Sequence, residues 1–151
     1  PKLEAVWDDS SWSTGSLSGL SSTDLENLKV YFKNLRTEYK ENSIVKFRLV
    51  GRELYPTTTF DTSPAELSVK YLPSGSIFYE VRDADTEEVI IPFGSGSKVS
   101  CDSIGNFFRV QMNGFQAERN YRFCVKVVSG SGTLDEQVNF YDDNYEFRVV
   151  R

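Results

Sequence analysis

The chain has 151 residues, of which 39% are hydrophobic and 14% aromatic, so it has enough apolar mass for a packed core and is not disordered throughout. Its length fits one domain, or one domain with an arm. The net charge of −5, with lysines and arginines dispersed beside as many carboxylates, argues against a nucleic-acid partner. No apolar run approaches the length of a membrane span, and we expect no membrane partner.

Residues 1–27 differ in composition from the rest of the chain. They contain both tryptophans, Trp7 and Trp12, and a run rich in serine and glycine at 11–22. Such runs are flexible and bury little surface of their own. Two interpretations remain open: a linker left from a longer polypeptide, or an arm whose two tryptophans anchor a partner. We predict a flexible arm over 1–27, a β-domain over 28–151, and Trp7 and Trp12 as partner-binding residues.

Two periodicities overlap just after this segment. One has the spacing of a helix and consists of Leu25, Leu28, Phe32 and Leu35. The other alternates like a strand, through Leu28, Val30 and Phe32. A polar turn predicted at 39–43 is followed by a second alternating segment at 45–49, and two such segments around a turn favour a β-pair. We therefore predict a strand rather than a helix.

Alternation continues to the end of the chain. Further strands are predicted at 67–71, 78–82, 88–91, 108–112, 121–127, 138–141 and 145–149, with a polar hairpin loop at 83–87. About eight short strands without a long amphipathic helix are typical of a sandwich or barrel. The residues predicted to form the core are Val45, Phe47, Leu49, Val69, Tyr79, Val81, Val110, Tyr121, Phe123, Val125, Val127 and Phe147.

One local pattern favours a particular sandwich. Phe115 stands six residues before Tyr121, which opens the most strongly alternating strand. This resembles the tyrosine corner, in which a tyrosine hydroxyl bonds back to the backbone at the edge of a sandwich. The predicted fold is all-β, an antiparallel immunoglobulin/fibronectin-like β-sandwich with an N-terminal extended arm.

The residues offer little for catalysis. The sequence has no histidine, which excludes Ser-His-Asp and Cys-His nucleophile systems and zinc sites that need histidine. Neither of the glycine-rich phosphate-binding patterns occurs. We predict no enzyme activity, no catalytic residue, no cofactor and no metal.

Pairs of carboxylates are the remaining candidates for chemistry. A glycosidase needs two acids held in a cleft, and calcium needs six to eight oxygen ligands, so solvated acids in hairpin loops are the favoured interpretation. The pairs are Asp8-Asp9, Asp83 with Asp85, Glu87-Glu88 and Asp142-Asp143.

Two cysteines, Cys101 and Cys124, invite comparison with the disulfide of immunoglobulin domains. There the second cysteine follows the corner tyrosine by two residues and faces the core. Cys124 follows Tyr121 by three residues, so alternation places it on the opposite face of its strand. Two free thiols are therefore predicted, as in a reducing compartment.

A set of short strings carries a resemblance. They are Gly51-Arg52-Glu53-Leu54-Tyr55-Pro56-Thr57, the hairpin from Phe78 to Thr86, Ile91-Pro92-Phe93, the string from Ser100 to Asn106, and Asn113-Gly114-Phe115. Together they make residues 36–150 resemble the C-terminal region of virion structural proteins from large contractile-tailed bacteriophages. The resemblance implies a β-rich, multicopy, non-catalytic part of the head, neck, tail or baseplate, assembled in the host bacterial cytoplasm.

Three functions follow as hypotheses. The resemblance implies a structural component of a bacteriophage virion, whose partners are other virion proteins and copies of itself. The alternative is a bacterial surface or secreted β-sandwich binding module, adhesin-like or carbohydrate-binding, since one fold serves many functions. A small enzyme is the least favoured, because the motifs for it are missing.

Overall fold

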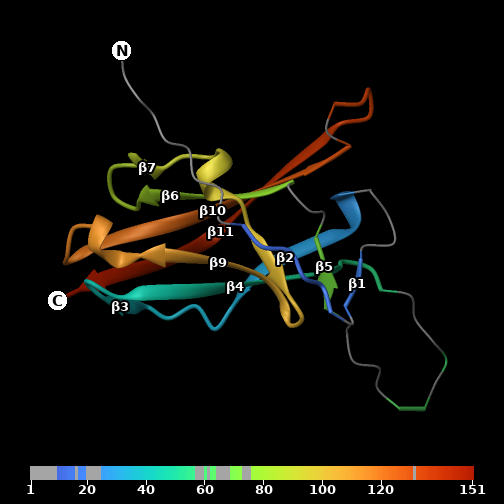
Figure 1. Ribbon diagram of the computed structural model, residues 1–151, viewed down its shortest axis with the longest axis horizontal. Coiled ribbons are helices and arrows are strands. Elements are labelled where there is room, and N and C mark those ends of the chain that lie inside the picture. The colour runs from blue at the N-terminus through green and yellow to red at the C-terminus, as the bar shows by residue number, and fades with distance from the viewer. Residues whose placement is uncertain are drawn as a thin grey trace.

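Two β-sheets packed face to face form the fold in the computed structural model (Figure 1). The structure describes residues 10–15, 17–19, 25–56, 60, 62–63, 69–72, 76–130 and 132–151. The prediction of an all-β chain with two packed sheets is confirmed. Most strand pairs are antiparallel, but two short pairs, β1 with β5 and β3 with β11, are parallel.

The first sheet has the order β1-β5-β4-β9-β8, with β2 also beside β4. Its strands are β1 (Ser18–Gly19), β2 (Leu28–Lys33), β4 (Ile44–Glu53), β5 (Lys70–Tyr71), β8 (Ser100–Asp102) and β9 (Gly105–Gln111). The second sheet has the order β3-β11-β10-β6-β7. Its strands are β3 (Glu38–Lys40), β6 (Ile77–Asp83), β7 (Val89–Ile91), β10 (Arg119–Ser129) and β11 (Gln137–Val150). Short 3₁₀ turns occupy η1 (Leu25–Asn27), η2 (Ser95–Ser97) and η3 (Met112–Gly114).

The core lies between the sheets and is rich in aromatic rings. Phe47 of β4 and Phe123 of β10 meet edge to face with centroids 4.7 Å apart, and Phe123 stacks on Phe147 at the same distance. Such pairs add to the free energy gained by burying apolar area. Ten of the twelve residues predicted for the core are buried, whereas Val45 and Val69 are half-buried.

The chain changes sheets directly after β2. Leu28 through Lys33 pair antiparallel with β4, as the strand prediction required. Asn34 then adopts a left-handed backbone with φ of 59°, and the chain crosses to the second sheet. There β3 pairs in parallel with β11, with Glu38 opposite Arg148. The turn predicted at 39–43 is wrong for Tyr39 and Lys40, because this pairing with a distant segment extends them into a strand.

The outer edge of β2 is covered by side chains of β11. An unpaired strand edge presents free carbonyls that another chain can bind. Here three side chains of the opposite sheet donate hydrogen bonds to carbonyls of η1 and β2: Asn139 to Leu25 (3.1 Å), Tyr141 to Leu28 (3.3 Å) and Tyr145 to Val30 (3.2 Å). These contacts satisfy the backbone of β2 and join the two sheets.

The last strand, β11, is one element where the sequence predicts two. Asn144, with φ of 59°, lies between the two predicted segments, and the pairing with β10 shifts register between Phe123 and Val125. Bulges of this kind bend a strand without ending it. The first half of β11 therefore extends with β10 into a hairpin that projects from one end of the molecule (Figure 1).

Candidate interaction surface

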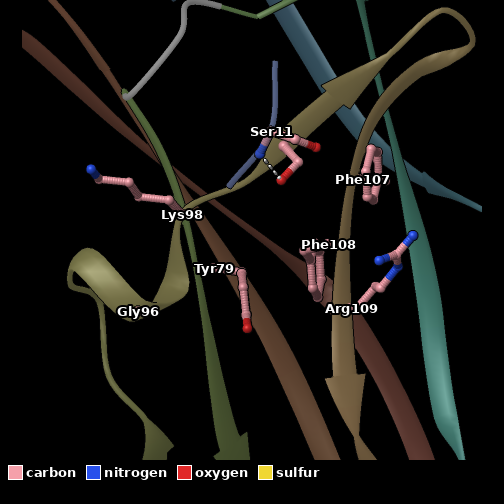
Figure 2. Close-up of a pocket in the computed structure, with 8 residues that line it drawn as sticks. Ser11, Tyr79, Gly96, Lys98, Phe107, Phe108 and Arg109 are labelled. Carbon is pink, nitrogen blue, oxygen red and sulfur yellow. Dashed lines mark hydrogen bonds between the residues drawn. The ribbon is translucent and has the colours of Figure 1, made fainter. Parts of the chain in front are cut away.

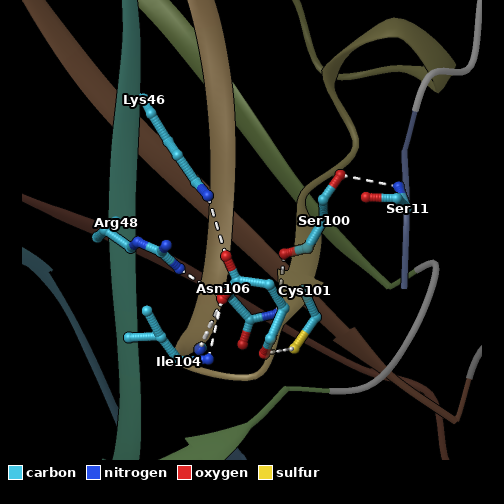
Figure 3. Close-up of polar contacts among 9 residues, drawn as sticks. Ser11, Lys46, Arg48, Ser100, Cys101, Ile104 and Asn106 are labelled. Atoms are coloured by element: carbon cyan, nitrogen blue, oxygen red, sulfur yellow. Dashed lines mark hydrogen bonds and ion pairs between the residues drawn. The ribbon is translucent and has the colours of Figure 1, made fainter. Parts of the chain in front are cut away.

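The outward face of the first sheet carries a charged cluster centred on Asp102. Its carboxylate contacts Nζ of Lys46 at 2.9 Å and Nη1 of Arg48 at 2.6 Å (Figure 3). The backbone N–H groups of Ile104 and Gly105 donate to the same carboxylate at 3.0 and 3.2 Å. The bond from Arg48, with smaller contributions from Lys46 and Ile104, holds the pKa of Asp102 well below its ordinary value. The carboxylate is thus charged and neutralises part of the basic charge on β4.

An aromatic ring supports the same cations. Lys46 Nζ lies 3.8 Å from the centroid of the Phe107 ring, and the guanidinium groups of Arg48 and Arg109 lie 5.4 and 5.7 Å away. Cations are attracted to the negative face of an aromatic ring. Phe107 therefore helps to hold these three long side chains over the sheet.

A cleft of about 600 Å³ opens beside β4, where the chain crosses from β2 to β3. Residues 44–47 of β4 pair with β9 on one side. On the other side the pairing with β2 ends at Lys33 opposite Arg48, so no described strand lies beside residues 44–47 there. The lining residues are Lys33, Asn34, Arg36, Glu38, Tyr39, Lys40, Ser43, Ile44, Val45, Lys46 and Arg48.

The lining of this cleft is strongly basic, although the chain as a whole is acidic. Lys46 and Arg48 are paired with Asp102. Lys33, Arg36 and Lys40 are exposed, and none of them has a carboxylate partner within the described part of the chain. Ile44, which is 68% exposed, adds an apolar contact at the mouth. The cleft thus combines free cations, an exposed aliphatic side chain and an unpaired strand edge.

Sequence reasoning does not identify this site. The dispersed lysines and arginines predict only a solvated surface, and the crossover after Asn34 is what brings Lys33, Arg36 and Lys40 to one cleft. The alternation of Lys46 and Arg48 with buried residues is a visible signal, but it places them on a face without naming their neighbours.

The structure places one of the two predicted partner-binding tryptophans. Trp12 packs edge-on against Tyr71, with ring centroids 6.5 Å apart, and is partly buried against the core. Its neighbours bond to β8: Ser13 N–H donates to the Cys101 carbonyl at 3.0 Å, and Cys101 N–H to the Ser11 carbonyl at 2.9 Å. Trp12 therefore covers the edge of its own sheet.

The rest of the predicted arm is described only in part, and one of its residues belongs to the core of the domain. Trp7 lies outside the described residues. Leu25, inside the segment 1–27, is 2% exposed and belongs to the core. Binding of a partner by Trp7 or Trp12, and the mobility predicted for residues 1–27, stay predictions.

The predicted carboxylate pairs separate into structural roles. Asp83 accepts hydrogen bonds from Asp85 N–H and Thr86 N–H, and its other oxygen lies 2.9 Å from Arg119 Nη1. The bond from Thr86 is the main cause that lowers the pKa of Asp83. Asp83 thus caps its own hairpin loop.

At each of the other described pairs, at least one acid faces a cation. Glu87 contacts Arg122, while Asp142 lies 3.6 Å from Arg122 and Asp143 lies 3.0 Å from Lys29. Asp8-Asp9 lies outside the described residues. Within the described ranges, no three cysteine, aspartate or glutamate side chains gather as metal ligands would.

Both cysteines are free, as predicted, and both are buried, although the alternation of β10 places Cys124 on the face opposite to Tyr121 and Phe123. Cys101 lies in β8 of the first sheet and Cys124 in β10 of the second. Burial raises the pKa of Cys124 to about 11 and also raises the pKa of Cys101. Neither thiol is thus activated as a nucleophile at neutral pH.

A second hollow, between η2, β6 and β9, is far smaller. It has a volume of about 50 Å³, and its walls include Tyr79 and Phe108, which stack with centroids 4.0 Å apart (Figure 2). Sites for organic ligands measure roughly 300–1,000 Å³. This hollow has room for ordered water and not for such a ligand.

Comparison with known proteins adds no assignment: the chain matches no protein-family model, no curated protein and no solved structure. Among the described residues there is also no helix long and apolar enough to cross a membrane.

Proposed function

We propose that this chain is a non-enzymatic structural component of a large contractile-tailed bacteriophage particle and acts through protein–protein contacts. The observation that carries the proposal is the basic cleft along the unpaired part of β4. Open strand edges are sites where another chain adds backbone and side-chain contacts. The bacteriophage setting rests on the sequence resemblance over residues 36–150.

The proposed fold within this function is an immunoglobulin-like sandwich. The order β2-β4-β9-β8 corresponds to strands A, B, E and D of that fold, and β11-β10-β6 corresponds to G, F and C. At the corner before β10, the Tyr121 hydroxyl accepts from Gln116 N–H at 2.8 Å and donates to its carbonyl at 3.2 Å. Both features support the assignment.

The proposed sandwich departs from antibody domains at one position. The residue two places after the corner tyrosine, a cysteine in antibody domains, is Phe123 here. Phe123 packs against Phe47 of β4. An aromatic contact thus joins the sheets where the antibody domain has its disulfide.

Immunogold electron microscopy tests the function. Antibodies raised against the purified chain are applied to purified particles of the encoding phage and, in parallel, to uninfected host cells. Labelling at a fixed, repeated position on the particle is expected, and adsorption of the antibody with the purified chain should remove it. Unlabelled particles would contradict the proposal, and labelled envelopes of uninfected cells would favour the alternative of a bacterial surface module.

A further inference from the structure

The tip of the β10–β11 hairpin carries a fully exposed apolar side chain, Leu134. Residues 132–137 are all exposed, and the Leu134 side chain is 105% exposed. The tip is nonetheless ordered by its own bonds: Thr133 N–H and hydroxyl donate to the Gly130 carbonyl, and Gly132 N–H donates to Glu136 Oε2 at 3.0 Å. An exposed leucine on a shaped turn suits insertion into a partner.

The carboxylates beside Leu134 are free to meet cations. Asp135 contacts no lysine or arginine of the described residues, and Glu136 bonds only to the backbone of its own turn. The other acidic hairpin, at 83–88, also presents two exposed carboxylates, Asp85 and Glu88, but no large apolar side chain lies between them. The β10–β11 tip therefore presents two available negative charges around one aliphatic side chain.

The basic cleft has the complementary character. Lys33, Arg36 and Lys40 supply cations that have no carboxylate partner among the described residues, and Ile44 and Tyr39 supply apolar surface between them. Its volume of about 600 Å³ leaves room for several side chains of an inserted turn. Opposite charges set around an apolar contact favour association and fix its register.

The two surfaces lie at opposite ends of the molecule. Figure 1 shows the β10–β11 hairpin projecting toward the upper right and β3, which lines the cleft, at the left. A tip therefore cannot reach the cleft of its own chain. Two different surfaces that complement each other make a heterologous contact, which allows copies to join head to tail.

We propose that the cleft beside β4 binds the β10–β11 tip of a second copy of this chain, with Asp135 and Glu136 facing Lys33, Arg36 and Lys40, and Leu134 packed near Ile44. This contact rests on the proposed structural function and specifies one partner for it. Because the contact is charged and exposed, salt weakens it.

Sedimentation velocity of the intact chain, from low to high micromolar concentration, tests the contact. At low salt we expect species larger than the monomer, and at high salt a loss of affinity of at least about tenfold. Two charge reversals should each give a monomer: Lys33→Glu with Arg36→Glu in the cleft, and Asp135→Lys with Glu136→Lys at the tip. The matched control, Asp85→Lys with Glu88→Lys in the other acidic hairpin, should associate like the wild type.

Mixing the two reversed variants gives the sharper result. In the mixture both contacts are restored between unlike copies, because the native tip meets the native cleft and the reversed tip meets the reversed cleft, so the mixture should associate although each variant alone stays a monomer. A wild-type chain that stays monomeric at every salt and concentration would overturn the proposal, as would association that neither reversal weakens. A monomeric wild type that binds a single-stranded oligothymidine, with loss in Lys33→Glu with Arg36→Glu, would instead assign the cleft to nucleic acid. None of these results alters the particle-labelling test, so the contact and the proposed function fail separately.

Discussion

The outer edge of β2 and the open edge of β4 at residues 44–47 differ in how their backbone groups are covered. Along both, no strand of the described residues lies beside the outer backbone groups. At β2, amide and hydroxyl groups of Asn139, Tyr141 and Tyr145 reach across from the second sheet and occupy the carbonyls. Beside residues 44–47 of β4 there is no continuation of β2, because the chain after β2 crosses to the second sheet. Cations line the cleft that is left there.

The difference arises at the crossover after β2, which separates a segment packed on the core from a segment that lines the cleft. Before Asn34 the chain belongs to the first sheet and is tied to the core, and after it the chain lines a cleft. Charged residues at an open edge discourage unselective pairing of strands while leaving the edge accessible to a partner of opposite charge. The comparison predicts that substitutions at β2 change folding and that those at the open edge of β4 change association.

The largest effect is expected for Phe32→Ala in β2. Phe32 stacks on Phe123 at 5.1 Å and contacts Tyr145 at 4.7 Å. Removing a buried ring of this kind lowers the free energy of unfolding by about 3–5 kcal/mol. Urea unfolding followed by tyrosine and tryptophan fluorescence measures the loss. Ile44→Ala, at the open edge, is the control and should change the free energy by less than about 0.5 kcal/mol.

Removing the hydroxyls that cover β2 should have an intermediate effect. The double substitution Tyr141→Phe with Tyr145→Phe keeps both rings and deletes the bonds to Leu28 and Val30, together with the exposed bond from Tyr145 to Asp143. We expect a loss of about 1–3 kcal/mol in the free energy of unfolding, because two buried-edge carbonyls lose their donors. Tyr39→Phe removes a hydroxyl at the cleft that accepts from the exposed Arg36 N–H at 2.9 Å. Because that N–H can bond to water instead, the loss should be less than about 0.5 kcal/mol. Equal losses in the two variants would contradict the distinction between the edges.

Asp102 connects the charged side of β4 to stability at low pH. Its folded-state pKa lies below the ordinary value of 3.8. A lowered pKa contributes stability that is present above the unfolded-state value and is lost as the pH falls through the folded-state value. The melting temperature should therefore fall below about pH 4.

Asp102→Asn should show a smaller fall over the same range and a loss of about 1 kcal/mol at pH 7, since the pair is partly exposed. Differential scanning calorimetry between neutral and acidic pH measures both. Asp85→Asn removes an exposed carboxylate of similar charge, and its curve should follow that of the wild type. A steeper fall for Asp102→Asn than for the wild type would show that the carboxylate does not stabilise the fold.

The smallest effect on folding is expected for Lys33→Glu with Arg36→Glu. Both side chains are exposed and lack a carboxylate partner in the described ranges, so the free energy of unfolding should change by less than about 0.5 kcal/mol. Thermal unfolding of the monomer by circular dichroism measures this change. A large drop in the melting temperature would assign these cations a structural role and contradict the separation of the two edges.

The sequence predicts the strands better than their neighbours. Alternation is a local signal, so it locates β2, β4, β6, β9 and β10 and most of the core around Phe123. The two-strand prediction for β11 differs from the structure because Asn144 bends the strand without ending it. The short strands β3 and β8 have too few residues to alternate and depend on distant partners.

The candidate site depends on tertiary structure in the same way. Lys33 and Lys46 are separated by a crossover and a turn. The pairing of β2 with β4 sets Lys33 opposite Arg48, and the pairing of β3 with β11 places the other wall of the cleft. Asn106 is a similar case, because this polar residue is fully buried. Its side chain accepts from Leu72 N–H and donates to the Ser100 carbonyl, and no periodicity of the sequence identifies these partners. Side-chain patterns locate faces, whereas long-range pairing decides which faces meet.

The continuity of β11 has a mechanical consequence. This strand runs from the projecting tip to the rungs with β3, where Arg148 N–H donates to the Thr37 carbonyl and Glu41 N–H to the Val150 carbonyl. Hydrogen bonds of an antiparallel ladder lie across the strands. Because the turn at the tip joins β10 to β11, tension applied there loads both strands together and shears their ladders with β6 and β3, so that several rungs must break at the same time rather than one after another. Strand β11 delivers that tension to β3 at the cleft, so a row of copies joined tip to cleft would resist stretching along its length.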